Sequence, residues 1–96
     1  MKMQPTVTVE YDLLDKGIVA GYMRLREGKV ARTVEIAPDL VLVDLNSRGV
    51  LLGVEILGPC EVTILERIAR KYHVPEVRSL ARHPRFAPVF RPVRTA

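Results

Sequence analysis

The chain has 96 residues, of which 48% are hydrophobic and 27% are charged. A chain of this length buries roughly 60 to 65% of its unfolded surface, which is enough for one modest core and excludes a multidomain enzyme. The composition is that of a folded globular domain, and it excludes a disordered chain and a coiled-coil rod. The single cysteine excludes an internal disulfide, and no stretch has the roughly 20 apolar residues of a membrane span. We therefore expect a cytoplasmic protein with no membrane association.

The positive charge is concentrated in the C-terminal part of the chain. The formal net charge is +4, yet residues 1–57 carry seven Lys/Arg and eight Asp/Glu, whereas residues 58–96 carry eight and three. Clustered cations favour a polyanion, because binding releases the counterions of that polyanion. The candidate contacts for a partner protein or a polyanion are Arg78, Arg82, Arg85, Arg91 and Arg94. These arginines are scattered among apolar residues and prolines, so a solvated or acid-paired surface is favoured, with a nucleic-acid site as the alternative.

The first strands are predicted from apolar residues that recur at every second position. Residues 6–13 show this alternation, which indicates a strand with one face directed inward. A turn at residues 15–17 leads to a second strand over 18–26, in which Gly21 indicates a bulge or a close backbone contact.

A tight connection is predicted after the second strand. Gly28 can adopt a positive φ without steric cost, so Leu25 and Val30 are expected to flank a hairpin. The third strand is then expected over residues 30–36, ending before a proline that interrupts sheet pairing.

Residues 40–45 and 50–57 predict the strongest hairpin in the sequence, joined by a turn at 46–49. Apolar residues occupy both faces of these two strands for most of their length. Because a one-sided core shelters only one face, the second must be covered by a helix, the C-terminal segment or another copy of the chain. The candidate interface on this face comprises Leu51, Gly53, Glu55 and Leu57. We therefore expect a homo-oligomer, with a dimer favoured.

One main helix is predicted over residues 59–72, because proline suits the first helical position and cations gather near the C-terminal end. Its expected apolar stripe consists of Val62, Leu65, Ile68, Ala69 and Tyr72. A short second helix is predicted over residues 75–82, with Val77, Leu80 and Ala81 directed inward. The prolines that follow predict an extended segment that lies on its own sheet, lies on a partner or is disordered.

Together these elements predict an α+β fold. It consists of an antiparallel meander sheet of about five strands, one main helix and a basic, proline-containing C-terminal arm. We expect a sheet-plus-helix domain over residues 1–74, with residues 75–96 forming the arm.

Four motifs resemble those of a known family. They are Tyr11-Asp12, the segment GKVARTVE at 28–35, Val43-Asp44-Leu45 with Gly49, and the segment LGVEIL at 52–57. In this order, over residues 9–57, the chain resembles the small prokaryotic family catalogued as domain of unknown function 2283. Asn46 replaces the acid of that family's turn, and residues 15–18 lengthen the approach to its second motif. The resemblance implies a compact antiparallel sheet followed by a helix, no assigned activity, and a hint of an antitoxin or accessory role.

The residues that bear chemistry form no recognisable catalytic or metal-binding motif. Metal ligation needs several converging donors, and Cys60, His73 and His83 are the only thiol and imidazoles. A reactive Cys60 is the alternative to a buried small hydrophobe, which is the favoured role. A capping or surface role is likewise favoured for His73 over a catalytic one.

Four carboxylates are expected on the strand face opposite the core, namely Glu10, Asp12, Glu35 and Glu55. Paired acids perform general acid/base catalysis or bind a hard cation only in a concave site. Because a flat sheet is not concave, cross-strand ion pairs with Arg24 and Arg32 are the favoured interpretation.

We therefore predict a non-enzymatic protein with no cofactor and no metal site, which self-associates through its sheet and acts as an interaction protein. The alternative is an antitoxin-like or nucleic-acid-binding accessory protein that uses the basic C-terminal segment. An enzyme is the third hypothesis, and it requires a pocket that holds Asp12, Glu35 and Glu55 together around a cation.

Overall fold

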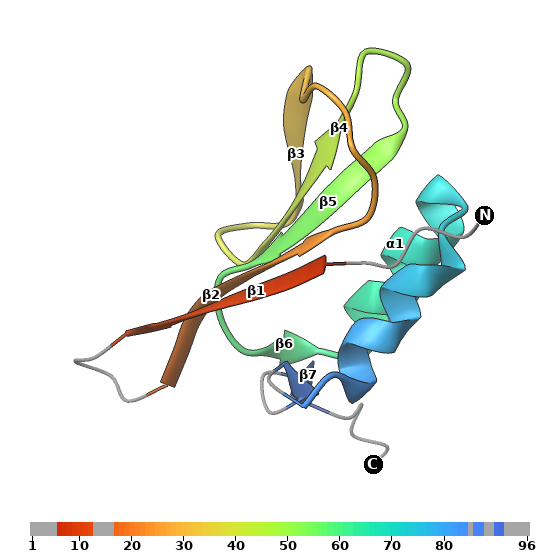
Figure 1. Cartoon of the computed structure of the whole chain (residues 1–96). Coiled ribbons are helices and arrows are strands. Elements are labelled where there is room, and N and C mark those ends of the chain that lie inside the picture. Colours follow the sequence, from red (N-terminus) through yellow and green to blue (C-terminus); the bar gives the residue numbers. More distant parts are fainter. Residues whose placement is uncertain (1–5, 13–16, 85, 88–89, 92–96) are drawn as a thin grey trace.

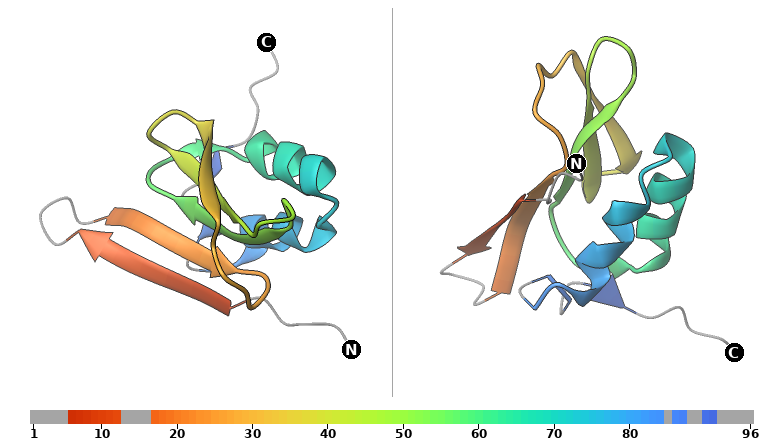
Figure 2. Two further views of the ribbon diagram at one scale, coloured as in Figure 1. Left: turned by 90° about the horizontal axis from the view of Figure 1, so that it is seen from above. Right: turned by 45° about the vertical axis from the view of Figure 1, so that its right-hand side comes forward.

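The computed structural model describes residues 6–12, 17–84, 86–87 and 90–91. In chain order its elements are β1 (Thr6–Asp12), β2 (Gly17–Arg24), β3 (Arg32–Ala37), β4 (Val41–Leu45), β5 (Leu51–Ile56), β6 (Cys60–Glu61), helix α1 (Thr63–Tyr72), 3₁₀ helix η1 (Pro75–Arg82) and β7 (Phe90–Arg91). Strands β1 to β5 form one antiparallel sheet, and α1 and η1 lie against one face of it (Figures 1 and 2). The predicted α+β class, five-stranded antiparallel sheet and following helix are confirmed. Neither helix in the described ranges is long and apolar enough to cross a membrane.

The strand order is β1-β2-β5-β4-β3, so the sheet is not a simple meander. The hairpin predicted around Gly28 is therefore wrong, because β2 pairs with β5 and β3 lies at the far edge. The backbone N–H groups of Leu25 and Arg26 donate to the carbonyl oxygen of Leu52, at 2.7 and 3.2 Å. These hydrogen bonds keep the chain beside β5 after β2 ends. The chain then crosses to the far edge of the sheet, where it forms β3.

The hairpin between β4 and β5 is confirmed, with the predicted turn. The Oδ1 atom of Asn46 accepts hydrogen bonds from the backbone N–H groups of Arg48 and Val50, at 2.8 and 2.9 Å. Gly49 has a φ of +81°, a left-handed conformation that favours glycine. The local sequence alone therefore accounts for this turn.

A β-bulge between β4 and β5 decides which side chains of β5 enter the core. Asp44 pairs with Gly53 and the next residue, Leu45, pairs with Leu51, so Leu52 is the extra residue. Leu51 is 0% exposed within the core cluster. Leu52 is buried outside that cluster, beneath the loop that follows β2. The prediction that Leu51 shares an interface with Gly53 is therefore wrong, because the bulge turns the Leu51 side chain into the core and leaves Gly53 on the opposite face.

Helix α1 begins at Thr63 rather than at residue 59, because the residues before it form β6, which pairs in parallel with β7. The helix ends at Tyr72, as predicted. His73 adopts a left-handed conformation with a φ of 57°, and its backbone N–H donates to the carbonyl oxygen of Ala69. The capping role predicted for His73 is therefore confirmed.

One core draws on both halves of the chain. The sheet contributes Met23, Leu25, Val41, Val43, Leu45, Leu51, Val54 and Ile56. The segment from residue 60 onward contributes Cys60, Ile64, Leu65, Ile68, Ala69, Val74, Val77, Leu80 and Phe86. Residues 75–84 and 86–87 are thus not an independent arm, because Val77, Leu80 and Phe86 pack in the same core as the sheet, beyond the predicted boundary at residue 74. Of the predicted arm, residues 85, 88–89 and 92–96 lie outside the described residues.

The close contact predicted at Gly21 is made by Phe86. A Cβ atom at residue 21 would overlap the phenyl ring of Phe86, which is 0% exposed. The ring also stacks on Phe90 with 6.3 Å between centroids and meets the edge of His83 at 6.4 Å. The missing side chain in β2 therefore makes room for an aromatic ring from the C-terminal segment.

Substituting Gly21→Ala should destabilise the fold by about 2 kcal/mol or more, because the buried ring cannot move aside without disturbing the core. In a Phe86→Leu background the same substitution should cost less, since the overlapping ring atoms are gone. Urea unfolding of the wild type, both single variants and the double variant measures this coupling. Additive effects of the two substitutions would contradict the proposed contact.

Candidate functional site

The candidate site is the face of the sheet opposite the helices, here called the outer face. The strand register places one row across it that contains Tyr22, Glu55, Leu42 and Glu35, and a second row that contains Arg24, Gly53, Asp44 and Thr33. Both helices lie on the other side of the sheet (Figure 2). Within the described ranges no helix covers the outer face, and Tyr22, Leu42 and Glu55 are half-buried there.

A hydrogen-bonded group crosses the centre of the outer face. The Tyr22 hydroxyl donates to Oδ2 of Asp44 at 2.9 Å, and the Thr33 hydroxyl donates to Oδ1 of the same carboxylate at 2.7 Å. The tyrosine reaches from β2 to β4 across Gly53 of β5, where a Cβ atom would overlap the phenol oxygen. Gly53, a predicted interface residue, is therefore buried beneath Tyr22.

The environment of Tyr22 favours the protonated phenol. Partial burial, followed by the hydrogen bond to Asp44 and the negative charge of that carboxylate, raises the pKa of Tyr22 from 10.0 to about 12. A phenol with this pKa stays a hydrogen-bond donor at neutral pH. The hydrogen bond between Tyr22 and Asp44 therefore ties β2 to β4 across the outer face. The sequence alone did not indicate this contact, because it depends on β5 lying between β2 and β4.

The four residues of the predicted acid patch are spread over three strands, β1, β3 and β5. Glu35 is on edge strand β3, where its Oε2 accepts a hydrogen bond from the backbone N–H of Asp39 at 3.0 Å. Glu55 is on β5, and in the register Leu42 of β4 lies between it and Glu35. Strand β1, which carries Glu10 and Asp12, is at the opposite edge of the sheet.

Across the described residues no group of three or more His, Cys, Asp and Glu side chains gathers closely enough to hold a metal ion. Arg24 pairs with Glu27 of the adjoining loop at 3.9 Å rather than across strands, so the predicted cross-strand pairing is wrong for this arginine. Cys60 is 5% exposed within the core, in agreement with the role of a buried small hydrophobe.

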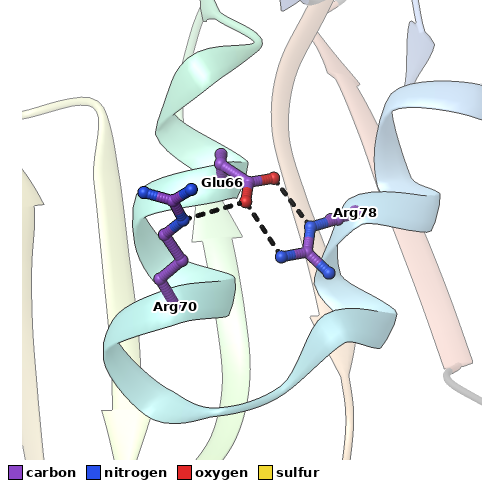
Figure 3. Close-up of polar contacts among 3 residues, drawn as sticks. All are labelled: Glu66, Arg70 and Arg78. Atoms are coloured by element: carbon purple, nitrogen blue, oxygen red, sulfur yellow. Dashed lines mark hydrogen bonds and ion pairs between the residues drawn. The ribbon is translucent and has the colours of Figure 1, made fainter.

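The predicted C-terminal arginines do not form one surface in the described part of the chain. Arg78 donates through Nε and Nη2 to the carboxylate of Glu66, at 2.7 and 2.9 Å, and Arg70 approaches the same carboxylate at 3.3 Å (Figure 3). The bidentate pair joins η1 to α1, so Arg78 is engaged within the fold. Arg82 is exposed at the end of η1, and the backbone of Arg91 is in β7. Arg85 and Arg94 lie outside the described residues.

A cationic groove, which the sequence analysis did not predict, lies between β3 and α1. Its volume is about 540 Å³, and it is lined by Glu35, Ile36, Arg67, Ile68, Arg70 and Lys71. The periodicity of α1 places its cations on the exposed side of the helix, but only the packing of α1 against the sheet brings them beside β3.

The comparisons with known proteins assign no family to this chain. No family model, no curated protein and no solved structure matches it. The resemblance to domain of unknown function 2283 over residues 9–57 stays an interpretation of four sequence motifs.

The raised pKa of Tyr22 predicts a loss of stability at alkaline pH. The phenol has a pKa of 10.0 in its ordinary environment and about 12 in the fold, so its stabilising contribution is complete below pH 10 and is lost as the pH rises from 10 through 12. The tyrosinate absorbance of the wild type minus that of Tyr22→Phe should titrate near pH 12. A difference curve centred on pH 10 would contradict this assignment.

The carboxylate of Glu66 should titrate below its ordinary pKa of 4.5, chiefly because Arg78 donates hydrogen bonds to it. Stability from this pair is present above pH 4.5 and is lost as the pH falls through the lowered pKa of the folded state. Carboxyl-carbon NMR should show the pKa of Glu66 returning towards 4.5 in Arg78→Gln. Arg70→Gln is the matched control and should produce a smaller return. An equal response to both substitutions would contradict the dominant role of Arg78.

Proposed function

We propose that the protein is a non-catalytic interaction module that self-associates through the outer face of its sheet. The observation that carries this proposal is the half-buried row of Tyr22, Glu55 and Leu42, which lies on a face that no described helix covers. Leu57, another predicted interface residue, is also half-buried. A second sheet packed on this row would complete the burial of Tyr22, Glu55 and Leu42.

The apolar part of this face is smaller than the sequence analysis predicted. The bulge places Leu51 in the core, and the loop after β2 covers Leu52. Among the residues whose side-chain exposure is described, 21–84, 86–87 and 90, Val30, at 46% exposure, is the one exposed large hydrophobe. Association would therefore depend on a mixed polar and apolar surface, and such a surface favours a weak, reversible dimer over an obligate one.

The charges of the outer face suit pairing with a second copy. Arg24 lies in the row next to Glu55, and Asp44 lies two strands from Arg24 in the same row. A two-fold axis through this face would bring Arg24 of one protomer opposite a carboxylate of the other. Such a pair would compensate Glu55, which loses solvent on association and then needs a cationic partner.

The nucleic-acid alternative draws less support from the described residues, because Arg78 is held by Glu66 and Arg82 is the remaining exposed arginine of η1. An enzyme draws less support still, because its carboxylates lie on separate strands. The interaction role is therefore the function that the geometry favours.

Sedimentation equilibrium tests this proposal, and we expect a dimer with a Kd of about 10 to 100 µM. Leu42→Glu should abolish the dimer, because a charge at the centre of the outer face opposes burial. Val30→Glu is the matched control, since the same charge is added to an exposed loop residue, and this variant should remain dimeric.

A charge exchange gives a second measurement. Arg24→Glu and Glu55→Arg should each weaken the dimer, and the double variant should restore part of the lost affinity. A wild-type protein that stays strictly monomeric at about 100 µM would overturn the proposed function.

A further inference from the structure

Strand β3 ends the sheet with one of its two sides unpaired. It pairs with β4, and no strand in the described ranges lies beside its other edge. The exposed backbone N–H and C=O groups of such an edge form a template to which an extended segment of another chain can add.

Burial is incomplete at this edge. Val34 and Ile36 of β3 face the core but are only partly buried, whereas Val41 and Val43 of the neighbouring β4 are 0% exposed. A further strand beside β3 would therefore shield apolar atoms that are still in contact with water.

The groove beside this edge is cationic. Arg67 and Lys71 are one helical turn apart on α1, so they project from the same face of the helix. Arg67 makes no hydrogen bond or ion pair with any described residue, and Arg70 is held at 3.3 Å from Glu66. Three cations against Glu35 give the lining of the groove a net positive charge.

We propose that β3 and α1 form a docking groove for a short, extended, acidic segment of a partner protein, which adds to the sheet as a strand beside β3. Alternate side chains of the added strand would point into the groove, where apolar groups contact Ile36 and carboxylates contact Arg67 and Lys71. The groove favours a peptide over a nucleic acid, because the unpaired strand edge and the partly buried Ile36 complement the backbone and apolar side chains of an extended peptide.

The edge also limits what can bind. Arg32 and Glu35 place charges on β3, and the pairing with β4 shifts register between Glu35 and Ala37. Charges and bulges of this kind oppose indiscriminate edge-to-edge pairing. The partner segment would therefore be short and matched in charge. Glu35 borders both surfaces, but the residues that carry this proposal, Ile36, Arg67 and Lys71, are not part of the outer face, so either proposal can fail without the other.

Fluorescence anisotropy with the full chain tests the groove. The probe is a labelled, acetylated peptide of about eight residues, a length typical of single strands, in which every second residue faces the groove. These groove-facing positions are valine and glutamate in turn, and the positions between them are threonine. We expect the acidic peptide to bind with an affinity that falls as salt is added, and the matched peptide with lysine in place of glutamate not to bind. N-methylation of every second amide should abolish binding when the methylated amides are those that face β3. Methylation of the other set should leave binding unchanged, because those amides lie on the edge of the added strand that faces away from β3.

Charge reversal locates the site. Arg67→Glu and Lys71→Glu together should weaken binding of the acidic peptide by about tenfold or more, whereas Arg26→Glu in the loop after β2 is the matched control and should leave it unchanged. Failure of the acidic peptide to bind, equal binding of both N-methylated registers, or unchanged affinity in the double variant would each overturn the proposal. Tighter binding of a single-stranded DNA oligonucleotide that competes with the peptide would also overturn it, in favour of a polyanion site.

Discussion

The contact between Phe86 and the backbone of Gly21 is the constraint on which the arrangement of the chain depends. The ring fills the space that a side chain on β2 would occupy, and it is fully buried there. This packing ties the segment after η1 to the sheet, beside the short pairing of β6 with β7 (Figure 1). The C-terminal segment thereby contributes to the same core as the sheet, which a chain of 96 residues needs because its apolar surface is limited.

The bulge between β4 and β5 determines the character of the opposite face. By turning Leu51 inward it adds a large side chain to the core, and it leaves Gly53 on the outer face, where Tyr22 crosses it to reach Asp44. The extra residue in β5 thus removes the Leu51 side chain from the outer face. The hydrogen-bonded pair of Tyr22 and Asp44 occupies the surface over Gly53 instead. For this reason the proposed dimer depends on a mixed polar and apolar surface rather than on a continuous apolar patch.

The two proposed contact surfaces differ in charge and in mode of recognition. The outer face carries charges of both signs and suits a second copy of itself, whereas the groove beside β3 has a net positive lining and suits a different, acidic chain. The bidentate pair between Arg78 and Glu66 holds η1 against α1. Helix α1 in turn supplies the cations of the groove. A protein with both surfaces would join copies of itself and present an edge to a partner.

The sequence by itself determined the local features. Alternating apolar residues predicted the strands, Asn46 and Gly49 specified the turn of the β4–β5 hairpin, and the inward positions of Val77 and Leu80 followed from helical spacing. The order of the strands, the bulge and the partner of Gly21 were decided only by the tertiary structure. These features depend on contacts between segments far apart in the chain, and neither a periodicity nor a turn motif records which segment will lie beside which. The outer face and the groove exist only once β5 has come between β2 and β4 and α1 has packed beside β3.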